Sequence, residues 1–357
     1  MQFGSSSIKA LAAGQLGIVQ AHRERWPEAE ELLKSAVTAL ETKETEPEGE
    51  PFAIPPEAEE SIRKFDVQYK RIYKFMLARA LHQNNKLDEA ENQYRKLADD
   101  GDAEAANNLG LVLKQQGRKG EAYTWFSRAA AKGDIYGQIN LARSLEDRGQ
   151  SEKAKLWYRK AADAGDGDAA AALGQIYNRN GDRKNALLWI NRAHGAHSAF
   201  GTFLLGEVLE QSKNLEKASE LYNTAGNSGY PHAMLHLGLI QERASRIAEA
   251  EDSYRRAAES GDDDAMVFLG TLLLRRLVNS GRDGTLTVES ERDVLSEAEK
   301  WYLRAKNLGH RKAGERLQIW SDIAKNGVQS YVKHLEEAED NAEKSASSTK
   351  RRSKKRR

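Results

Sequence analysis

The stretch AEAANNLGLVLKQQGRKGEAYTWFSRAAAKGD, residues 103–134, recurs along the chain with a period of 32 residues. In this copy the pair Leu109-Gly110 is followed by Ala122 and then by an aromatic residue, Phe126. Steps of 32 residues find leucine at positions 77, 109, 141, 173, 205, 237 and 269. A repeat of this length is typical of an array in which each structural unit packs on its neighbours. The sequence therefore predicts a repeat architecture.

Each unit is predicted to be a pair of antiparallel helices. In the second half of the quoted copy, Ala122, Phe126 and Ala129 fall at i, i+4 and i+7, which is the spacing of one helix face. Residues 103–113 carry a matching apolar stripe, and a turn containing Gly117 separates the two halves. Because the connection is short, the two helices are expected to run antiparallel.

Glycine marks both the ends and the middle of the predicted helices. Glycine followed by aspartate combines a helix stop with an N-cap for the next helix. This pair occurs at 101–102, 133–134, 165–166 and 261–262. The glycine after the repeated leucine lies in mid-helix, where it costs about 1 kcal/mol relative to alanine. We therefore expect a close helix crossing there, with the aromatic residue of the partner helix filling the space beside the glycine.

The order Leu-Gly, alanine 12 positions after the glycine, aromatic at 16 and alanine at 19 resembles the tetratricopeptide repeat. The stretch KLWYRKAADAGD, residues 155–166, is similar to the related Sel-1-like repeat. The resemblance covers residues 71–310. It implies an all-α fold, a right-handed α-solenoid of stacked antiparallel helix pairs. The resemblance also implies a function in binding other molecules.

Five segments are predicted along the chain. They are a divergent N-terminal repeat (1–42), an acidic, proline-rich linker (43–56), seven helix-pair repeats (57–310), C-terminal capping helices (311–343) and a disordered basic tail (344–357). The seventh repeat contains an insertion at about 277–293. We expect the extra length between its two helices, either as a functional projection or as tolerated drift.

Composition excludes several classes of protein. The chain has no cysteine, so disulfides and cysteine-based metal or nucleophile chemistry are absent. The sequence contains no run of about 18 apolar residues, so it predicts no membrane span. The first 20 residues do not resemble a secretory signal. A cytoplasmic location is the resulting expectation.

Motifs for catalysis are missing from the sequence. We find no phosphate-binding loop, nucleophile elbow or dinucleotide fingerprint. His232 and His236 are spaced to share a metal on one helix, and His194 and His197 are candidates to join them, but no further ligand has a diagnostic spacing. We therefore predict no enzyme, no cofactor and no metal. A hydrolase or metal enzyme remains the weakest of three hypotheses.

The favoured hypothesis is a non-enzymatic scaffold or adaptor that binds a protein or peptide. In tetratricopeptide domains the first helix of each pair lines a concave groove, and the resemblance carries this role to the non-core positions of those helices. The candidate groove residues are Asn107, Asn108, Leu111, Tyr136, Asn140, Arg143, Gln175, Arg179, Phe200, Phe203, Glu207, His236 and Arg243. Asparagine and arginine side chains suit a peptide backbone or a carboxylate. Phe200 and Phe203 are alternatively packing residues.

The alternative hypothesis rests on the C-terminal basic tail. Its seven basic residues are Lys350, Arg351, Arg352, Lys354, Lys355, Arg356 and Arg357. The last eight residues carry no acid, which leaves the other 349 residues at −6 within a total charge of +1. The tail contains no aromatic residue for base stacking, so binding to nucleic acid or to an acidic surface would be electrostatic and not sequence-specific. A purely solubilising tail is equally consistent with this composition.

Overall fold

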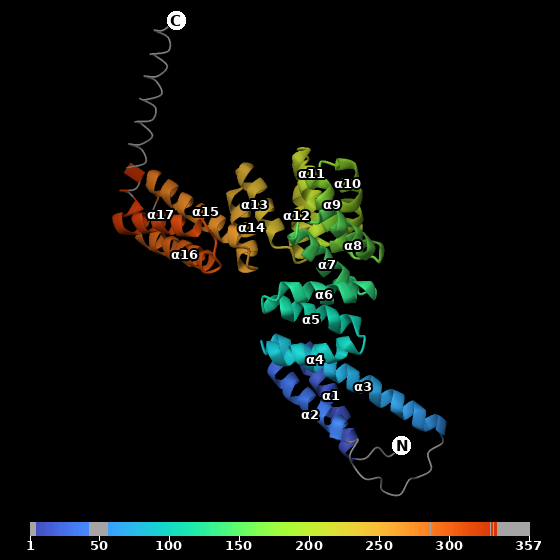
Figure 1. Ribbon diagram of the computed structural model, residues 1–357. Helices are drawn as coiled ribbons and strands as arrows, with labels where there is room; N and C mark the ends of the chain where they lie inside the picture. Colours follow the sequence, from blue (N-terminus) through green and yellow to red (C-terminus); the bar gives the residue numbers. More distant parts are fainter. Residues whose placement is uncertain (1–4, 43–55, 286, 329, 331, 334–357) are drawn as a thin grey trace. The chain divides into compact units, whose positions relative to one another are not determined.

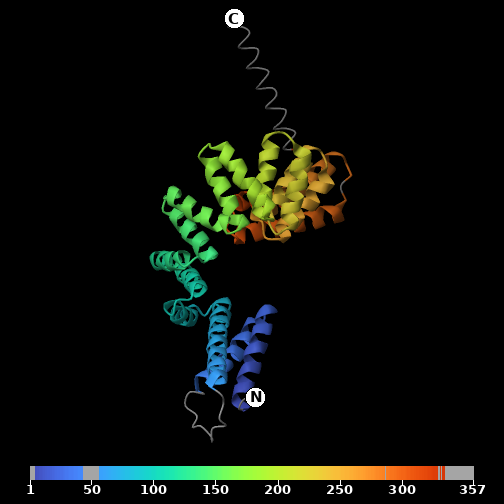
Figure 2. The same cartoon turned by 90° about the vertical axis from the view of Figure 1, so that its right-hand side faces the viewer.

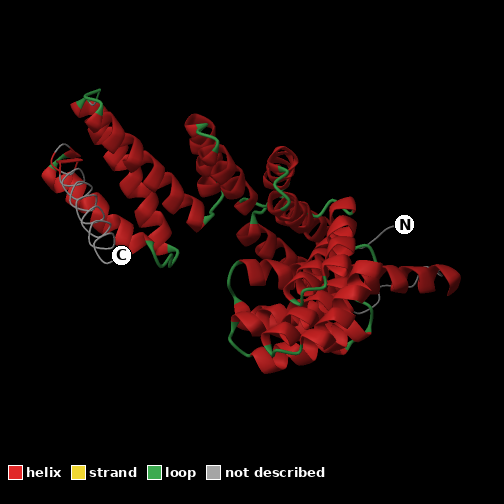
Figure 3. Ribbon diagram, turned by 90° about the horizontal axis from the view of Figure 1, so that it is seen from above, coloured by secondary structure: helices red, strands yellow, loops and turns green. Residues whose placement is uncertain are grey.

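The computed structural model describes residues 5–42, 56–285, 287–328, 330 and 332–333 (Figure 1). The chain divides into two compact units, Met1–Asn180 and Gly181–Arg357. Within the described residues every regular element is a helix, and no strand occurs (Figure 3). None of these helices is both long enough and apolar enough to cross a membrane.

The first unit contains nine helices in its described residues. They are α1 (Ser5–His22), α2 (Trp26–Thr42), α3 (Pro56–Gln83), α4 (Leu87–Asp99), α5 (Ala103–Gln115), α6 (Lys119–Ala131), α7 (Ile135–Asp147), α8 (Ser151–Asp163) and α9 (Gly167–Arg179). Helices α1 and α2 lie side by side and pack against α3 (Figures 1 and 2). Tyr73 of α3 is fully buried, and its hydroxyl donates a hydrogen bond to the Leu11 carbonyl oxygen at 3.3 Å.

The second unit contains eight helices in its described residues. They are α10 (Arg183–Gly195), α11 (Ala199–Gln211), α12 (Leu215–Asn227), α13 (His232–Arg243), α14 (Ile247–Glu259), α15 (Asp263–Arg282), α16 (Val288–Asn307) and α17 (Ala313–Asn326). Residues 328, 330, 332 and 333 are also helical.

Both units are built from stacked helix pairs, as predicted. Helix α5 packs on α6 and α7 on α8 in the first unit, while α11 packs on α12 and α13 on α14 in the second. The second helix of each pair then packs on the first helix of the following pair, as α6 does on α7 and α14 on α15. The fold is therefore an all-α repeat solenoid, because each pair buries its apolar faces against the pairs on either side.

The mid-helix glycines have the packing role that the sequence predicts. A Cβ atom added at Gly110 would lie 2.5 Å from Cε1 of Phe126, and one added at Gly238 would lie 2.5 Å from Cε1 of Tyr254. Gly206 has the same relation to Tyr222. Each aromatic ring therefore occupies the space that a larger residue on the partner helix would need. The aromatic residues at this repeat position, namely Tyr94, Phe126, Tyr158, Tyr222, Tyr254 and Tyr302, are at most 2% exposed.

The predicted glycine–aspartate boundaries are also confirmed. Gly133 has a φ of 88°, in the left-handed region that glycine adopts easily. The four aspartates that follow such glycines each accept a hydrogen bond from the backbone N–H three residues later, as Asp102 does from Ala105 at 3.0 Å. Because these caps satisfy backbone groups at the start of α5, α7, α9 and α15, they fix where those pairs begin.

The seventh repeat differs from the expectation of an insertion between two helices. Its extra residues lengthen both helices, because α15 and α16 have 20 residues each whereas α5 and α6 have 13 each. The run LLLRRLV at 272–278 continues the helical apolar stripe, and Leu273, Leu274, Leu277 and Val278 are buried. Apart from Pro56, the predicted linker at 43–56 lies outside the described residues, as do residues 334–343 of the predicted caps and the whole of the tail.

Candidate functional site

The first helices of successive pairs form a shared surface in each unit. We define the first-helix surface as the face made by α3, α5, α7 and α9 in the first unit and by α11, α13 and α15 in the second. Polar side chains 33 residues apart meet across it. This separation is one residue more than the repeat, so that neighbouring first helices touch at adjacent positions of the same motif.

A Tyr–Glu–Arg triad recurs on this surface. Its glutamate receives a hydrogen bond from the tyrosine of its own pair and an ion pair from an arginine of the next first helix. Tyr222 donates to Glu210 at 2.8 Å, and Arg243 donates to the other oxygen of Glu210 at 2.9 Å. The same arrangement occurs in Tyr158–Glu146–Arg179 and in Tyr254–Glu242–Arg275. Each triad therefore joins three helices through one carboxylate.

The contacts within the triads shift the pKa values of several of their members. Burial alone would raise the pKa of Glu210, but hydrogen bonds from Tyr222 and Arg243 outweigh it and lower that pKa. Burial, together with the adjacent carboxylate, raises the pKa of Tyr222 and of Tyr254. Glu210 is thus an anion at neutral pH, and Tyr222 and Tyr254 stay neutral hydrogen-bond donors.

A pocket of about 340 Å³ opens on the first-helix surface between α13 and α15. Its lining residues are Leu239, Glu242, Arg243, Phe268, Thr271, Leu272 and Arg275. Phe268 is 39% exposed although it is a large apolar residue. The Arg243 and Arg275 side chains are 65% and 51% exposed, and each is anchored by its triad. The pocket therefore combines apolar walls with two held guanidinium groups, a combination suited to an apolar side chain beside an acid.

An aromatic cluster is formed by residues of α11, of α13 and of the connection before α13. The ring centre of Phe203 is 4.9 Å from that of Tyr230 and 5.0 Å from that of His236. Phe200 stacks on Phe203, with ring centres 6.4 Å apart. Phe203 is only 5% exposed and is a packing residue, whereas Phe200 is half-buried at the edge of the cluster.

In the first unit the structure brings some predicted groove residues together. Asn140 donates a hydrogen bond to the side-chain oxygen of Asn107 at 2.8 Å, and Asn107 is only 5% exposed. Asn108 donates to the backbone oxygen of Glu104 in its own helix at 2.9 Å. Tyr136 and Arg143 are exposed. The asparagines thus stabilise the array, and little of Asn107 remains accessible to a partner.

The remaining predicted groove residues fall in different surroundings. Gln175 is exposed, and Leu111 is half-buried. Arg179 is 60% exposed and pairs with Glu146 at 2.6 Å. Glu207 is half-buried, and this burial raises its pKa. His236 lies 3.8 Å from Glu210, and burial lowers its pKa.

Three of the four histidines of the metal hypothesis have different polar partners. His232 contacts Asp262, with 2.8 Å between Nδ1 and Oδ2. His236 faces Glu210, and Nδ1 of His194 lies 3.0 Å from the Thr202 hydroxyl. His197 is exposed, with a φ of 59°. Although the rings of His232 and His236 are 5.2 Å apart, their nearest polar partners differ.

Most of the pocket residues were not predicted from the sequence pattern. Leu239, Glu242, Phe268, Thr271, Leu272 and Arg275 were absent from the predicted groove. The repeat itself carried the signal, because a step of 32 residues from His236 reaches Phe268 and the same step from Arg243 reaches Arg275.

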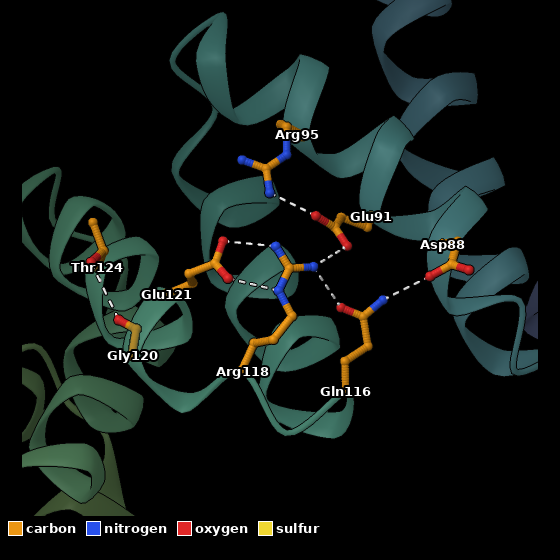
Figure 4. A network of polar contacts seen from close by, with 8 residues as sticks. All are labelled: Asp88, Glu91, Arg95, Gln116, Arg118, Gly120, Glu121 and Thr124. Atoms are coloured by element: carbon orange, nitrogen blue, oxygen red, sulfur yellow. Dashed lines mark hydrogen bonds and ion pairs between the residues drawn. The ribbon is translucent and has the colours of Figure 1, made fainter.

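A second polar network lies away from the first-helix surface, at the junction of α4 and α6 (Figure 4). Arg118 donates hydrogen bonds to both oxygens of Glu121 and to Glu91, all at 2.7 Å. Arg95 binds Glu91 at 2.6 Å, and Gln116 donates to Asp88 at 3.1 Å. Because its charged groups contact one another across three segments, this network stabilises the junction and is not a candidate ligand site.

The chain shares its fold with known repeat proteins. A tetratricopeptide repeat model matches residues 75–135 and 224–265. The structure of a Sel1 repeat protein from Oxalobacter formigenes is similar over 89% of this chain and 94% of that chain, with 19% identity and a TM-score of 0.53. The structure of a protective antigen of uropathogenic Escherichia coli, which has an SLR fold, is similar over 84% of this chain and 66% of that chain. The identity is 20% and the TM-score is 0.47. None of the curated proteins compared with the sequence matches it.

The stacked helix pairs and their first-helix surface define the class of α-solenoid repeat proteins. Within that class, two parts of the chain match the tetratricopeptide repeat model, and the fold is similar to that of a Sel1 repeat protein. Such folds commonly act as protein-interaction scaffolds and are typically non-enzymatic.

Proposed function

We propose that this protein is a non-enzymatic scaffold or adaptor that holds a partner peptide on the first-helix surface of its second unit. The observation that supports this function is the pocket between α13 and α15, where the exposed Phe268 stands beside Arg243 and Arg275. The occupant is a peptide with an apolar side chain close to a carboxylate.

The two halves of this recognition use different parts of the pocket. Phe268 and Leu239, with the buried Leu272 behind them, offer apolar area to one side chain. Arg275 is held through one nitrogen, Nη2, by Glu242, and Arg243 is held through Nη1 by Glu210. Because each guanidinium has five N–H donors and both side chains are more than half exposed, further donors face the partner. Anchoring by the triads reduces the entropy that these arginines lose on binding.

Along the rest of the surface, Phe200, Glu207 and His236 extend the proposed contact area on α11 and α13. The accessible predicted residues of the first unit, namely Tyr136, Asn140, Arg143, Gln175 and Arg179, form a second candidate contact area. A cytoplasmic location belongs to the proposal and is tested by cell fractionation. The basic tail, residues 344–357, lies outside the described residues, and its binding to nucleic acid or an acidic surface stays a prediction.

The function is tested with a random peptide library displayed on phage and selected on the immobilised full chain. Selected peptides are then synthesised with a fluorophore and titrated by anisotropy. We expect an apolar residue within a few positions of Asp, Glu or a free C-terminus, and at least a tenfold loss of affinity in the variant Phe268→Asp.

The matched control is Leu188→Asp, which places the same charge at another exposed apolar residue of the second unit. Leu188 is 61% exposed and lies on α10, a second helix of a pair. It should leave affinity unchanged. Selected peptides that bind Phe268→Asp as tightly as the unmodified chain would overturn the proposed site.

A further inference from the structure

Outside the peptide site, the beginning of α15 gathers side chains of the kinds that bind metal ions. Asp262 caps α15, with Oδ1 accepting from the Ala265 N–H at 2.7 Å. Its other oxygen, Oδ2, lies 2.8 Å from Nδ1 of His232, at the start of α13. Asp264 lies two residues after the cap. One ligand atom from each of His232, Asp262 and Asp264 can be chosen so that all three lie within 4.8 Å of one another.

A neighbouring histidine, His310, orients the carboxylate of Asp264. Nε2 of His310, in the loop before α17, lies 3.0 Å from Oδ1 of Asp264. Nδ1 of the same ring accepts a hydrogen bond from the Lys312 N–H at 3.2 Å, which places the proton of a neutral ring on Nε2. His310 therefore donates to Asp264 and acts as an outer partner of a ligand.

Another helix cap of the chain provides a comparison. At Asp102, the cap of α5, the second carboxylate oxygen accepts from Nε and Nη2 of Arg71. A guanidinium neutralises that aspartate but cannot bind a metal ion. At Asp262 the corresponding partner is an imidazole, which can act as a ligand through Nδ1. Among the residues that the structure describes, three ligand-type side chains converge in this way only at α15.

The chemistry of the set favours one metal. Two carboxylates and one imidazole are ligands that Zn²⁺ accepts at about 2.0–2.2 Å, and three protein ligands leave a fourth position for water. Ligand atoms around tetrahedral Zn²⁺ lie roughly 3.3–3.6 Å apart. Rotations of the side chains that move their ligand atoms by about 1 Å would therefore complete the site. The Asp262 side chain is 9% exposed whereas that of Asp264 is 52% exposed, which leaves a path from solvent.

We propose that His232, Asp262 and Asp264 bind one Zn²⁺ ion, with His310 holding Asp264 in place. The ion joins the start of α13 to the start of α15. This site is separate from the peptide pocket, so either one can fail without the other.

The test uses the full chain, stripped with EDTA and dialysed into metal-free buffer, and titrated with ZnCl₂ by isothermal titration calorimetry. We expect one Zn²⁺ per chain and a rise in melting temperature on Zn²⁺ addition. Affinity should fall at least tenfold in His232→Gln and in Asp264→Asn, and the Zn²⁺-dependent rise should disappear. Neither substitution removes the Asp262 cap. His310→Gln should weaken binding by a smaller factor.

The matched control is His236→Gln, because His236 lies one helical turn from His232 but faces Glu210. It should leave Zn²⁺ affinity unchanged. The site would be overturned if Zn²⁺ binding is not saturable, or if the double variant His232→Gln/Asp264→Asn binds Zn²⁺ with unchanged affinity. It would also be overturned if Mg²⁺ and Ca²⁺ bind as tightly as Zn²⁺, because that result would show only general attraction to acidic groups.

Discussion

The hydroxyl of Tyr254 donates a hydrogen bond to the carboxylate of Glu242 at 2.7 Å, across the two helices of one repeat. The ring of the same tyrosine fills the space beside Gly238. One residue therefore contributes both apolar packing and a polar link, and Arg275 continues that link into the next repeat. The coupling between neighbouring repeats thus depends on a few repeated positions, which can be tested one at a time.

The first prediction concerns the tyrosine hydroxyl. Tyr254→Phe should lower the free energy of unfolding by about 1–2 kcal/mol, because the bond that it removes has a charged acceptor. Tyr302→Phe is the matched control, since that hydroxyl contacts the neutral Thr271 at 3.1 Å, and its loss should be about 0.5–1 kcal/mol. Urea unfolding followed by circular dichroism measures both, and equal losses would argue against charge assistance in the triad.

The second prediction concerns the mid-helix glycines. Gly238→Ala should destabilise the chain by about 1–3 kcal/mol, because the new methyl group would meet the Tyr254 ring at 2.5 Å and overpacking outweighs the gain in helix propensity. Gly120→Ala in α6 is the control. No atom lies within 4 Å of its added Cβ, so this variant should gain up to about 1 kcal/mol. Thermal unfolding of the two variants should therefore shift in opposite directions, and a shift in the same direction would count against the packing role.

The third prediction is a pH dependence from Glu30 in α2. Burial opposes its ionisation, but hydrogen bonds from Lys34, Lys86 and Asn84 outweigh it and lower the pKa of Glu30 from 4.5 to about 2. The Glu30 side chain is 8% exposed. Because the folded-state pKa is below the unfolded value, its stabilisation is present above pH 4.5 and is lost as the pH falls towards 2.

Glu30→Gln should therefore lower the unfolding free energy by about 1–3 kcal/mol at pH 7 and by much less near pH 2.5. The control is Glu31→Gln, an exposed neighbour on the same helix, which should show little effect at either pH. Urea titrations at the two pH values measure this difference. A loss that is the same at both would show that Glu30 acts through packing alone.

The fourth prediction separates two adjacent arginines of α15. Arg275→Gln should weaken binding of a selected peptide about tenfold, because it removes a charge-assisted contact from the pocket. Arg276→Gln removes the same charge one residue away, where the side chain pairs with Glu251, and should leave affinity within twofold. Fluorescence anisotropy at constant salt measures both. Equal losses would indicate general attraction by positive charge.

The fifth prediction concerns the C-terminal sequence. If the basic tail binds nucleic acid, the full chain should retard a labelled duplex in a gel and a chain ending at Thr349 should not. Binding should weaken steeply as salt rises from 50 to 200 mM, by about 10³-fold or more if six to seven phosphates are neutralised. Equal retardation by both chains would assign the contact to the repeats.

The repeat and the contacts inside one helix pair follow from local sequence pattern. The 32-residue period, the glycine–aromatic pairs such as Gly110 and Phe126, and the caps such as Asp102 all depend on residues close in sequence or on spacing within one helix pair. Local propensity and close packing fix those features, which is why pattern alone was sufficient for them.

Which side chains meet between pairs depends on how the pairs stack, and pattern alone does not give it. Asn140 contacts Asn107, Arg275 contacts Glu242, and His232 contacts Asp262, and each pair is separated by 30–33 residues in the sequence. Whether such residues meet depends on the rotation and translation between stacked pairs, and the sum of many core contacts sets that geometry. For the same reason the extra residues of the seventh repeat became longer helices, because the apolar face of 272–278 had a neighbouring surface on which to pack.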